Sequence, residues 1–238
     1  MALVTGGAKR VGRAIVQMLA DARFDVAFTF LESEADANSL SRELGSRLAK
    51  ALPIKADLTH PTEAVEAIFS SFSQHFSRLD LLVNNASFFT KADLAATTPA
   101  LFERLMAIHV QSPVLLAQKF AAMLRANRGH IVNMIDLLAE KPWPAYLPYS
   151  ASKAALANAT LSLARELAPE VTVNGIAPGV IEWPADMPAS VREQYLKRVP
   201  LGRSGTPEEA AKLVKYLVTD GAYITGQIIR LDGGRSIG

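Results

Sequence analysis

Short apolar runs alternate with longer amphipathic stretches along the whole chain. Runs rich in Val, Ile, Leu and Phe predict β-strands at residues 2–5, 25–30, 51–56, 80–84, 130–134, 171–176 and 227–231. Stretches with apolar residues at helical spacing predict helices at residues 10–22, 35–48, 61–76, 99–127, 149–167 and 207–219. Such alternation predicts an α/β fold, a Rossmann-like doubly wound parallel sheet of about seven strands with helices on both faces.

The start of the last predicted helix and the segment before it carry local signals. Thr206 is suited to cap the helix, Pro207 to its first position, and two acidic residues follow in the first turn. Residues 181–205 are rich in Pro and lack a strand pattern. Because ligands of such sheets bind outside the carboxyl ends of the strands, we expect this segment to form a lid over the substrate.

Composition is consistent with one enzyme domain spanning residues 1–238. Half of the residues are hydrophobic, which is enough for a large core, and a formal charge of +2 does not indicate nucleic acid or a membrane as partner. The absence of cysteine excludes disulfides, thiolate metal sites and cysteine catalysis, and we predict no metal site. The first strand begins at residue 2 and no apolar run reaches ~20 residues, so we expect a cytoplasmic protein.

A glycine-containing turn links the first strand to the first helix. It contains Gly6 and Gly12, with Arg10 where the usual pattern has a third glycine between them. Backbone N–H groups at the start of a helix in this position face the pyrophosphate of a dinucleotide. The turn therefore indicates a dinucleotide-binding unit, although similar turns also occur as plain connectors.

A tyrosine and a lysine four positions apart, Tyr149 and Lys153, are predicted to share one helix face. The unperturbed phenol pKa is about 10, and a nearby ammonium favours the phenolate. We therefore expect Lys153 to lower the pKa of Tyr149, so that the pair can donate a proton near neutral pH.

Further motifs follow the later strands, at spacings typical of one known family. They are Asp57-Leu58, Asn84-Asn85-Ala86-Ser87 and Asn174-Gly175-Ile176-Ala177-Pro178-Gly179. With the glycine turn and the Tyr149/Lys153 pair, the chain resembles the short-chain dehydrogenase/reductase family from residue 2 to residue 234. Within the family it is most similar to pteridine reductases, through Ala8-Lys9-Arg10, Ser87 with Phe89, Asp136, and Asp186-Met187-Pro188 leading to Val199-Pro200-Leu201.

The resemblance implies roles for three catalytic residues. Tyr149 would donate the proton while nicotinamide delivers hydride, and Lys153 would also hold the nicotinamide ribose. The third member is usually a serine thirteen positions before the tyrosine, and Asp136 stands there. An ionised carboxylate would repel a developing alkoxide but is suited to relay a proton towards a ring nitrogen or to orient amino groups.

The resemblance also implies a flat, nitrogen-rich substrate. Phe89 would stack on a pterin, although adjacent Phe88 leaves the identity of the stacking residue open. Ser87 would bond the pterin edge or a phosphate, and Arg10 would lie beside the pyrophosphate within reach of the substrate. The family's asparagine in the proton relay corresponds to His109, to which we assign no catalytic role.

The cofactor residues follow from the same motifs. They are Gly6, Lys9, Arg10, Val11, Leu31, Glu32, Asp57, Leu58, Asn85, Ala86, Tyr149, Lys153, Pro178, Gly179 and Ile181. NADP-dependent members carry an arginine where Glu32 stands, and a glutamate would repel the 2′-phosphate but accept a hydrogen bond from a free 2′-OH. Lys9 and Arg10 can pair with that phosphate, so NADP(H) is favoured and NAD(H) stays open.

Two classes of function are compatible with these residues. The first is a reductase of a small molecule, either a pteridine such as a dihydropterin or dihydrofolate, or a carbonyl compound such as a 3-oxoacyl thioester. The second is a non-catalytic dinucleotide sensor, which the presence of both Tyr149 and Lys153 opposes. The family resemblance implies a homo-oligomer, usually a tetramer.

Overall fold

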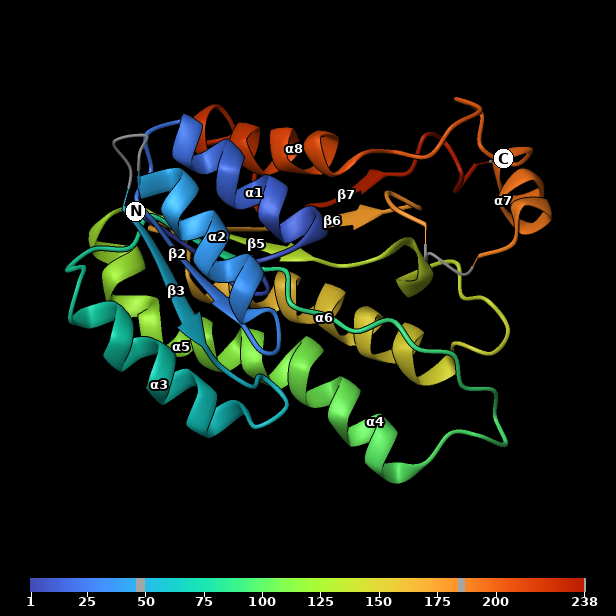
Figure 1. The fold of residues 1–238 in the computed structure, drawn as a ribbon, viewed down its shortest axis with the longest axis horizontal. Coiled ribbons are helices and arrows are strands. Elements are labelled where there is room, and N and C mark those ends of the chain that lie inside the picture. Colours follow the sequence, from blue (N-terminus) through green and yellow to red (C-terminus); the bar gives the residue numbers. More distant parts are fainter. Residues whose placement is uncertain (46–49, 184–186, 238) are drawn as a thin grey trace.

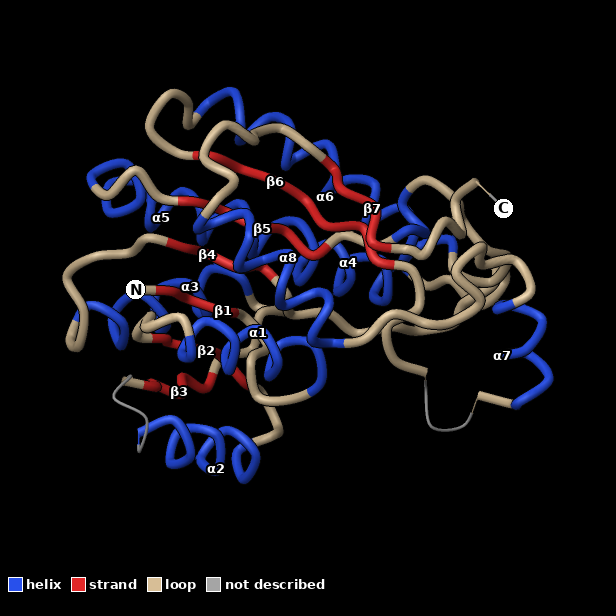
Figure 2. Tube along the Cα trace, turned by 90° about the horizontal axis from the view of Figure 1, so that it is seen from above, coloured by secondary structure: helices blue, strands red, loops and turns tan. Residues whose placement is uncertain are grey.

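One seven-stranded parallel sheet forms the centre of the molecule, as a computed structural model shows for residues 1–45, 50–183 and 187–237. The strand order is β3-β2-β1-β4-β5-β6-β7 (Figure 2). The strands are β1 (Ala2–Val4), β2 (Val26–Phe30), β3 (Ala51–Lys55), β4 (Leu81–Asn84), β5 (His130–Met134), β6 (Thr172–Pro178) and β7 (Ile228–Leu231). This sheet confirms the predicted α/β fold.

Helices cover both faces of the sheet (Figure 1). One face carries α1 (Arg10–Asp21), α2 (Glu34–Gly45) and α8 (Pro207–Thr219). The other carries α3 (Pro61–Ser73), α5 (Ser112–Ala126) and α6 (Leu147–Glu166). Three further helices lie toward the carboxyl ends of the strands, namely α4 (Pro99–Met106), the short 3₁₀-helix η2 (Leu137–Ala139) and α7 (Ala189–Leu196).

Adjacent residues of each central strand serve different cores, because successive side chains of a strand point to opposite faces. Val4 packs with Ile15 and Val214 under α1 and α8, whereas its neighbour Leu3 packs under α3 and α5. On that second face Phe120 meets Phe72 edge to face, with ring centroids 5.1 Å apart. The continuous apolar runs of the sequence are thus explained by burial on both sides.

Several element boundaries differ from the sequence-based expectation. The predicted helix 99–127 is α4 and α5 joined by a π-helical turn, η1 (Ala107–Gln111). The structure has a helix, α7, within residues 181–205, where the sequence predicted none. The prediction missed it because its sequence has little amphipathic pattern, with only Tyr195 buried. Residues 46–48 of the predicted second helix and residues 184–186 of the predicted lid, which include Asp186 of one matched motif, lie outside the described residues.

The helix cap predicted at Thr206 is present, and Glu209 completes it as a capping box. The Thr206 hydroxyl accepts from the Glu209 N–H at 3.3 Å, and the Glu209 carboxylate accepts from the Thr206 N–H at 2.9 Å. These bonds satisfy free donors of the first turn and fix where α8 begins. The helix then packs along α1.

The sheet reverses its strand order between β1 and β4, which lie side by side in parallel register. The chain leaves β1 toward β2 and leaves β4 toward β5, so the two connections diverge and open a crevice at the carboxyl ends. In the first connection Gly6 has a φ of +64°, and a Cβ on Gly12 would lie 2.0 Å from the Gly6 carbonyl oxygen. Glycine is therefore required for this tight turn.

Candidate active site

A pocket of about 620 Å³ occupies this crevice and brings most of the predicted site residues together. Its lining includes Gly6, Lys9, Arg10, Val11, Leu31, Leu58, Asn85, Ala86, Ser87, Phe89, Asp136, Tyr149, Lys153, Pro178, Gly179 and Ile181. Of the predicted set, Glu32 and Asp57 are not among the lining residues. Residues from distant parts of the sequence thus converge on one cavity.

Tyr149 and Asp136 are in direct contact inside the pocket. The Tyr149 hydroxyl donates to Asp136 Oδ2 at 2.8 Å, and Oδ1 of the same carboxylate accepts from the Leu138 N–H at 2.8 Å. Asp136 stands just after β5 and caps η2, while Tyr149 lies in the first turn of α6. The two elements therefore hold a phenol and a carboxyl group around one shared proton.

The electrostatics of this pair contradict one prediction. Burial and the Asp136 carboxylate raise the pKa of Tyr149 well above its ordinary value, and burial raises the pKa of Asp136. Lys153 does not lower the phenol pKa as expected, because its ammonium donates to the Met134 carbonyl oxygen at 2.8 Å and lies 5.9 Å from the centre of the tyrosine ring. The carboxylate, not the ammonium, is the immediate partner of the phenol.

Lys153 is itself an almost fully buried cation. Burial lowers its pKa from 10.5 to about 8, while the charge of Asp136 acts in the opposite direction. The ammonium thus titrates within reach of physiological pH. Lys153 lines the pocket, and its ammonium uses one donor on Met134 and keeps further donors for a bound hydroxyl group.

His109 belongs to a chain of hydrogen-bonded polar side chains whose partners sequence reasoning did not predict; His109 and Ser152 are buried, and exposed Ser87 lines the pocket. Its Nε2 lies 2.8 Å from Ser87 Oγ and its Nδ1 lies 2.8 Å from Ser152 Oγ, and Ser152 donates to the Tyr149 carbonyl oxygen at 2.7 Å. Burial, with the charge of Lys153, lowers the His109 pKa to about 2, so the imidazole is neutral. Helical spacing alone could not pair a residue at 109 with residues at 87 and 152.

Aromatic side chains form the outer wall of the pocket. Phe89 stacks on Tyr146, with ring centroids 4.6 Å apart and planes inclined by 19°, and its edge meets Tyr149. Phe88 also lines the pocket but packs under the Arg104 guanidinium. Of the two phenylalanines, Phe89 is the more exposed, at 45%.

Three further aromatic residues of this wall were missed from the sequence. Tyr195 meets Trp143 and Trp183 edge to face, with ring centroids 5.6 and 5.3 Å apart. The Tyr195 hydroxyl accepts from the Val180 N–H at 3.1 Å and so ties α7 to the loop after β6. These residues come from three separate segments, and their order along the chain carries no periodic signal.

The glycine turn is braced by the loop after β4. The Asn85 amide donates to the carbonyl oxygens of Thr5 and Gly6 at 3.0 and 3.1 Å, and the Thr5 hydroxyl accepts from the N–H groups of Asn85 and Ala86. Beside this brace, the start of α1 reaches the pocket through Val11 and Gly12. This glycine cradle at a helix N-terminus fits the pyrophosphate of a dinucleotide.

The two cations predicted to meet a phosphate are each paired with a carboxylate. Lys9 Nζ lies 3.0 Å from Asp36, and the Arg10 guanidinium forms an ion pair with Glu182 across the mouth of the pocket. Arg10 has a φ of 52°, in the left-handed region where the usual pattern has glycine. Glu32 is exposed and lies just after β2, beside Leu31.

Asp57 plays a local structural part next to the pocket. Its carboxylate accepts from the Thr59 hydroxyl at 2.7 Å and from the Thr59 N–H at 2.9 Å, and the hydroxyl bond is the main reason why its pKa is lowered. Leu58 lines the pocket beside it. The predicted adenine contact of Asp57 remains a prediction.

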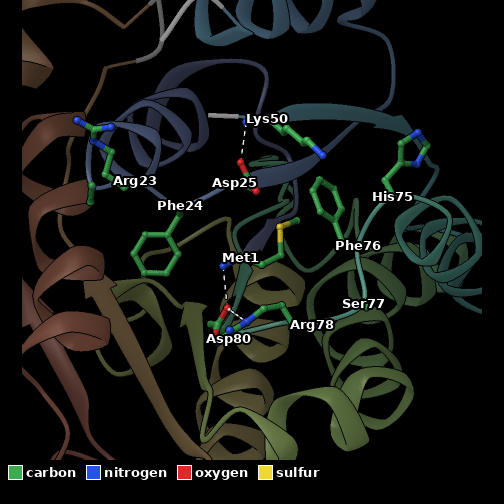
Figure 3. A pocket seen from close by; sticks show the side chains of 11 residues that line it. Met1, Arg23, Phe24, Asp25, Lys50, His75, Phe76, Ser77, Arg78 and Asp80 are labelled. Atoms are coloured by element: carbon green, nitrogen blue, oxygen red, sulfur yellow. Dashed lines mark hydrogen bonds and ion pairs between the residues drawn. The ribbon is translucent and has the colours of Figure 1, made fainter. Parts of the chain in front are cut away.

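A second hollow of about 540 Å³ lies at the opposite edge of the sheet (Figure 3). There the Met1 amino group donates to Asp80 Oδ2 at 2.7 Å, Arg78 pairs with the same carboxylate, and Asp25 accepts from the Lys50 N–H. No predicted site residue lines it. The predicted site residues that line a pocket thus lie in the one at the carboxyl ends.

Residues 1–45, 50–183 and 187–237 contain neither a group of metal-ligating side chains nor a helix that could span a membrane. No three His, Asp or Glu side chains in these ranges are grouped so that they could hold a metal ion. Within the same ranges, no helix has the length and apolar character that crossing a bilayer would need.

Comparison with known proteins gives consistent matches over the whole chain. A family model described as enoyl-(acyl carrier protein) reductase matches residues 6–236. Pteridine reductase 1 of Leishmania tarentolae is 32% identical, covering 100% of this chain and 96% of that protein, and a 3-oxoacyl-[acyl-carrier-protein] reductase of Synechocystis is also 32% identical, covering 98% and 96%. The structure of FolM alternative dihydrofolate reductase 1 from Brucella suis with NADP is 35% identical, with a TM-score of 0.92 over 100% of this chain and 95% of that one.

The buried charge of Lys153 leads to a prediction about stability and pH. The folded-state pKa is about 8 and the unfolded-state value is 10.5, so between these values the unfolded chain binds more protons and stability rises with pH. Lys153→Met removes the cost of burying the charge. We expect it to raise the free energy of unfolding at pH 7 by up to about 3 kcal/mol, and this gain to shrink as pH rises from 8 to 10.5.

Denaturant unfolding of the wild type and the variant over this pH range measures the effect. Lys212→Met, at an exposed position of α8, is the matched control and should change stability by no more than ~0.5 kcal/mol without a pH trend. A Lys153→Met protein that is less stable than the wild type at pH 7 would show that the buried ammonium is net stabilising.

Proposed function

The chain belongs to the short-chain dehydrogenase/reductase family, and we propose that within this family of oxidoreductases it is a pteridine reductase. The substrate would be a dihydropterin or a dihydrofolate-like compound. A nicotinamide dinucleotide, when bound, supplies the hydride, and the residues of this chain bind the two reactants and deliver the proton. The observation that carries the proposal is the hydrogen bond between Tyr149 and Asp136.

Asp136 favours reduction of a C=N bond over reduction of a carbonyl group. Hydride addition to C=N leaves electron density on a nitrogen that must be protonated, and the carboxyl group, 2.8 Å from the phenol, can pass the Tyr149 proton inward. Addition to a ketone instead places negative charge on oxygen, which an ionised carboxylate at this position would repel. Burial raises the pKa of Asp136 and so eases its protonation during such a relay.

Lys153 has two roles in the proposed reaction. Its ammonium lies on the pocket wall with Met134 as its fixed acceptor, in a position to hold the hydroxyl groups of a ribose. Its positive charge also opposes the burial cost of Asp136. One residue thus positions the cofactor sugar and balances the charge of the proton donor pair.

The aromatic wall fits a flat heterocycle. Phe89 offers a ring face at the mouth, and offset stacking of aromatic rings contributes ~0.5–1.5 kcal/mol beyond burial. Ser87 and Asp136 provide polar contacts for the edge of such a ring, and Arg10 lies at the entrance. Residues 181–183 and Met187 line the same side, so we propose that residues 181–205 form the lid over the substrate.

The names of relatives support this proposal and one alternative. Pteridine reductase 1 and the FolM dihydrofolate reductase belong to the proposed class, but the 3-oxoacyl reductase of Synechocystis is as similar in sequence as the former. A carbonyl reductase is therefore the second candidate. A non-catalytic sensor is not a candidate, because the family comprises oxidoreductases and both Tyr149 and Lys153 line the pocket. By family resemblance we also propose a cytoplasmic homotetramer.

Oxidation of NADPH and of NADH by the purified protein tests the function. Dihydropterins, quinonoid dihydropterin and dihydrofolate form one substrate panel, and small ketones with a 3-oxoacyl thioester form the other. We expect turnover with the first panel, and Tyr149→Phe should reduce it by more than 10-fold while leaving cofactor affinity nearly unchanged, because only the proton donor is removed. Turnover of the second panel alone would overturn the pteridine assignment.

Asp136→Ser restores the residue typical of the family and separates the two candidate reactions. If the carboxyl group relays the proton, dihydropterin reduction should fall by about 10²-fold, while ketone reduction stays unchanged or improves. Steady-state kinetics with one substrate of each kind measure both. A ketone activity that disappears in Asp136→Ser, in a protein that ignores every dihydropterin, would instead assign the aspartate to carbonyl chemistry.

Glu32→Arg tests the choice between cofactors, for which we propose NADP(H). If Glu32 faces the 2′ position, the substitution exchanges a repulsion for a charge-assisted pair and should shift the preference toward NADPH by about 10- to 100-fold. Binding titrations with NADPH and NADH measure the ratio, and Glu34→Arg, two residues further on in α2, is the control for added charge. An unchanged ratio would mean that Glu32 does not face the 2′ position and that Lys9 and Arg10 decide the preference.

A further inference from the structure

The polar chain Ser87, His109, Ser152 has a defined hydrogen-bond direction; Ser87 is exposed, and the other two residues are buried. Ser152 has one hydroxyl proton, and it goes to the Tyr149 carbonyl oxygen at 2.7 Å, which can only accept. Ser152 Oγ must therefore accept the contact from His109 Nδ1 at 2.8 Å, so the imidazole proton is on Nδ1. The lone pair of Nε2 then faces Ser87 Oγ, 2.8 Å away, and Ser87 is the donor in that contact.

Because His109 is neutral, its ring carries a single proton, and the direction of both its hydrogen bonds is fixed. The residue is almost completely buried, and burial with the nearby charge of Lys153 lowers its pKa to about 2. A second ring proton, which would reverse the contact with Ser87, is therefore excluded over the physiological range. The Ser87 hydroxyl also interacts with the Tyr149 phenol, whose own proton goes to Asp136. We assign the Ser87 proton to Nε2 of His109, because a buried ring nitrogen left without a donor would carry the full cost of its desolvation.

Helix geometry gives His109 its place in the chain. It lies in the middle of the π-helical turn η1, where α4 would otherwise run directly into α5. Such turns widen a helix locally and are frequent at functional sites. The widened turn sets the imidazole between the loop after β4 and α6, with its edge against the Tyr149 ring at a centroid distance of 5.4 Å.

We propose that His109 is a positioning residue that holds the Ser87 hydroxyl as an obligate hydrogen-bond acceptor toward the pocket. With its proton given to Nε2, Ser87 can offer only lone pairs to a substrate, so the site selects a ring with an N–H donor at this point. The proposal rests on the proposed pteridine reduction and specifies it: the ring amide or amino group of a dihydropterin supplies such a donor, whereas a simple ketone does not. A hydroxyl group that is free to rotate could accept from an N–H group or donate to a carbonyl oxygen.

Nitrogen NMR of histidine-labelled protein tests the hydrogen-bond direction without any substrate. We expect His109 to show the Nδ1-protonated tautomer and no titration between pH 5 and 9, and Ser87→Ala to shift its Nε2 signal. His109→Asn identifies the signals by their disappearance. A protonated Nε2 would overturn the proposal, because Ser87 would then be free to donate into the pocket.

Kinetics with a dihydropterin and a small diketone test the selection. His109→Asn and Ser87→Ala should each raise the KM for the dihydropterin about 10-fold, with a smaller change in kcat, and should lower the preference for dihydropterin over diketone. The double variant should lose little more than either single one, since both remove the same contact. His75→Asn, exposed and outside the pocket, controls for the substitution type.

Turnover by the wild type tests the proposed function, whereas the variants test the positioning role of His109. A wild type that reduces no dihydropterin would refute the proposed function, and the tautomer would still report on His109. Additive effects of the two substitutions, or an equal loss with both substrates, would overturn the positioning role. Thermal unfolding of each variant excludes loss of folding as the cause.

Discussion

The parallel pairing of β1 with β4 is the constraint on which the rest of the site depends. These strands lie side by side with Val4 opposite Val83, yet the chain departs from them in opposite directions. The loops that follow them cannot cover the space between them, and Asn85 draws the two together by bonding the carbonyl oxygens of Thr5 and Gly6. A cleft with glycine on its floor is the geometric result.

Burial of ionisable groups in this cleft determines the chemistry. Asp136, Tyr149 and Lys153 are each taken out of water, and burial disfavours the charged form of all three. Their arrangement compensates in part, because the ammonium and the carboxylate attract each other while the phenol shares its proton with the carboxylate. The resting state therefore keeps the proton on Tyr149, in contact with a second group that can carry it onward.

Local patterns were enough to predict the sheet and most of the pocket, and they failed where contacts join distant segments. Apolar runs and the Thr206 helix cap depend on neighbours along the chain, and both predictions agree with the structure. The aromatic wall around Tyr195 depends on side chains from three segments, so no spacing reveals it. The prediction that the pKa of Tyr149 is lowered was wrong for a similar reason. Lys153 is near Tyr149 along the helix, but Asp136 is the group that the fold brings into contact with the phenol.

The ion pairs of Lys9 and Arg10 are compatible with their predicted role at a phosphate. Both side chains are more than half exposed, at 56% and 59%, and exposed ion pairs typically contribute only ~0–1 kcal/mol. Exchanging Asp36 or Glu182 for a phosphate oxygen thus costs little, whereas a phosphate offers Arg10 a charge-assisted, two-pronged contact. The left-handed backbone of Arg10 supports the same conclusion. A non-glycine residue held at a φ of 52° is strained, and such strain is commonly found where side-chain position serves a binding site.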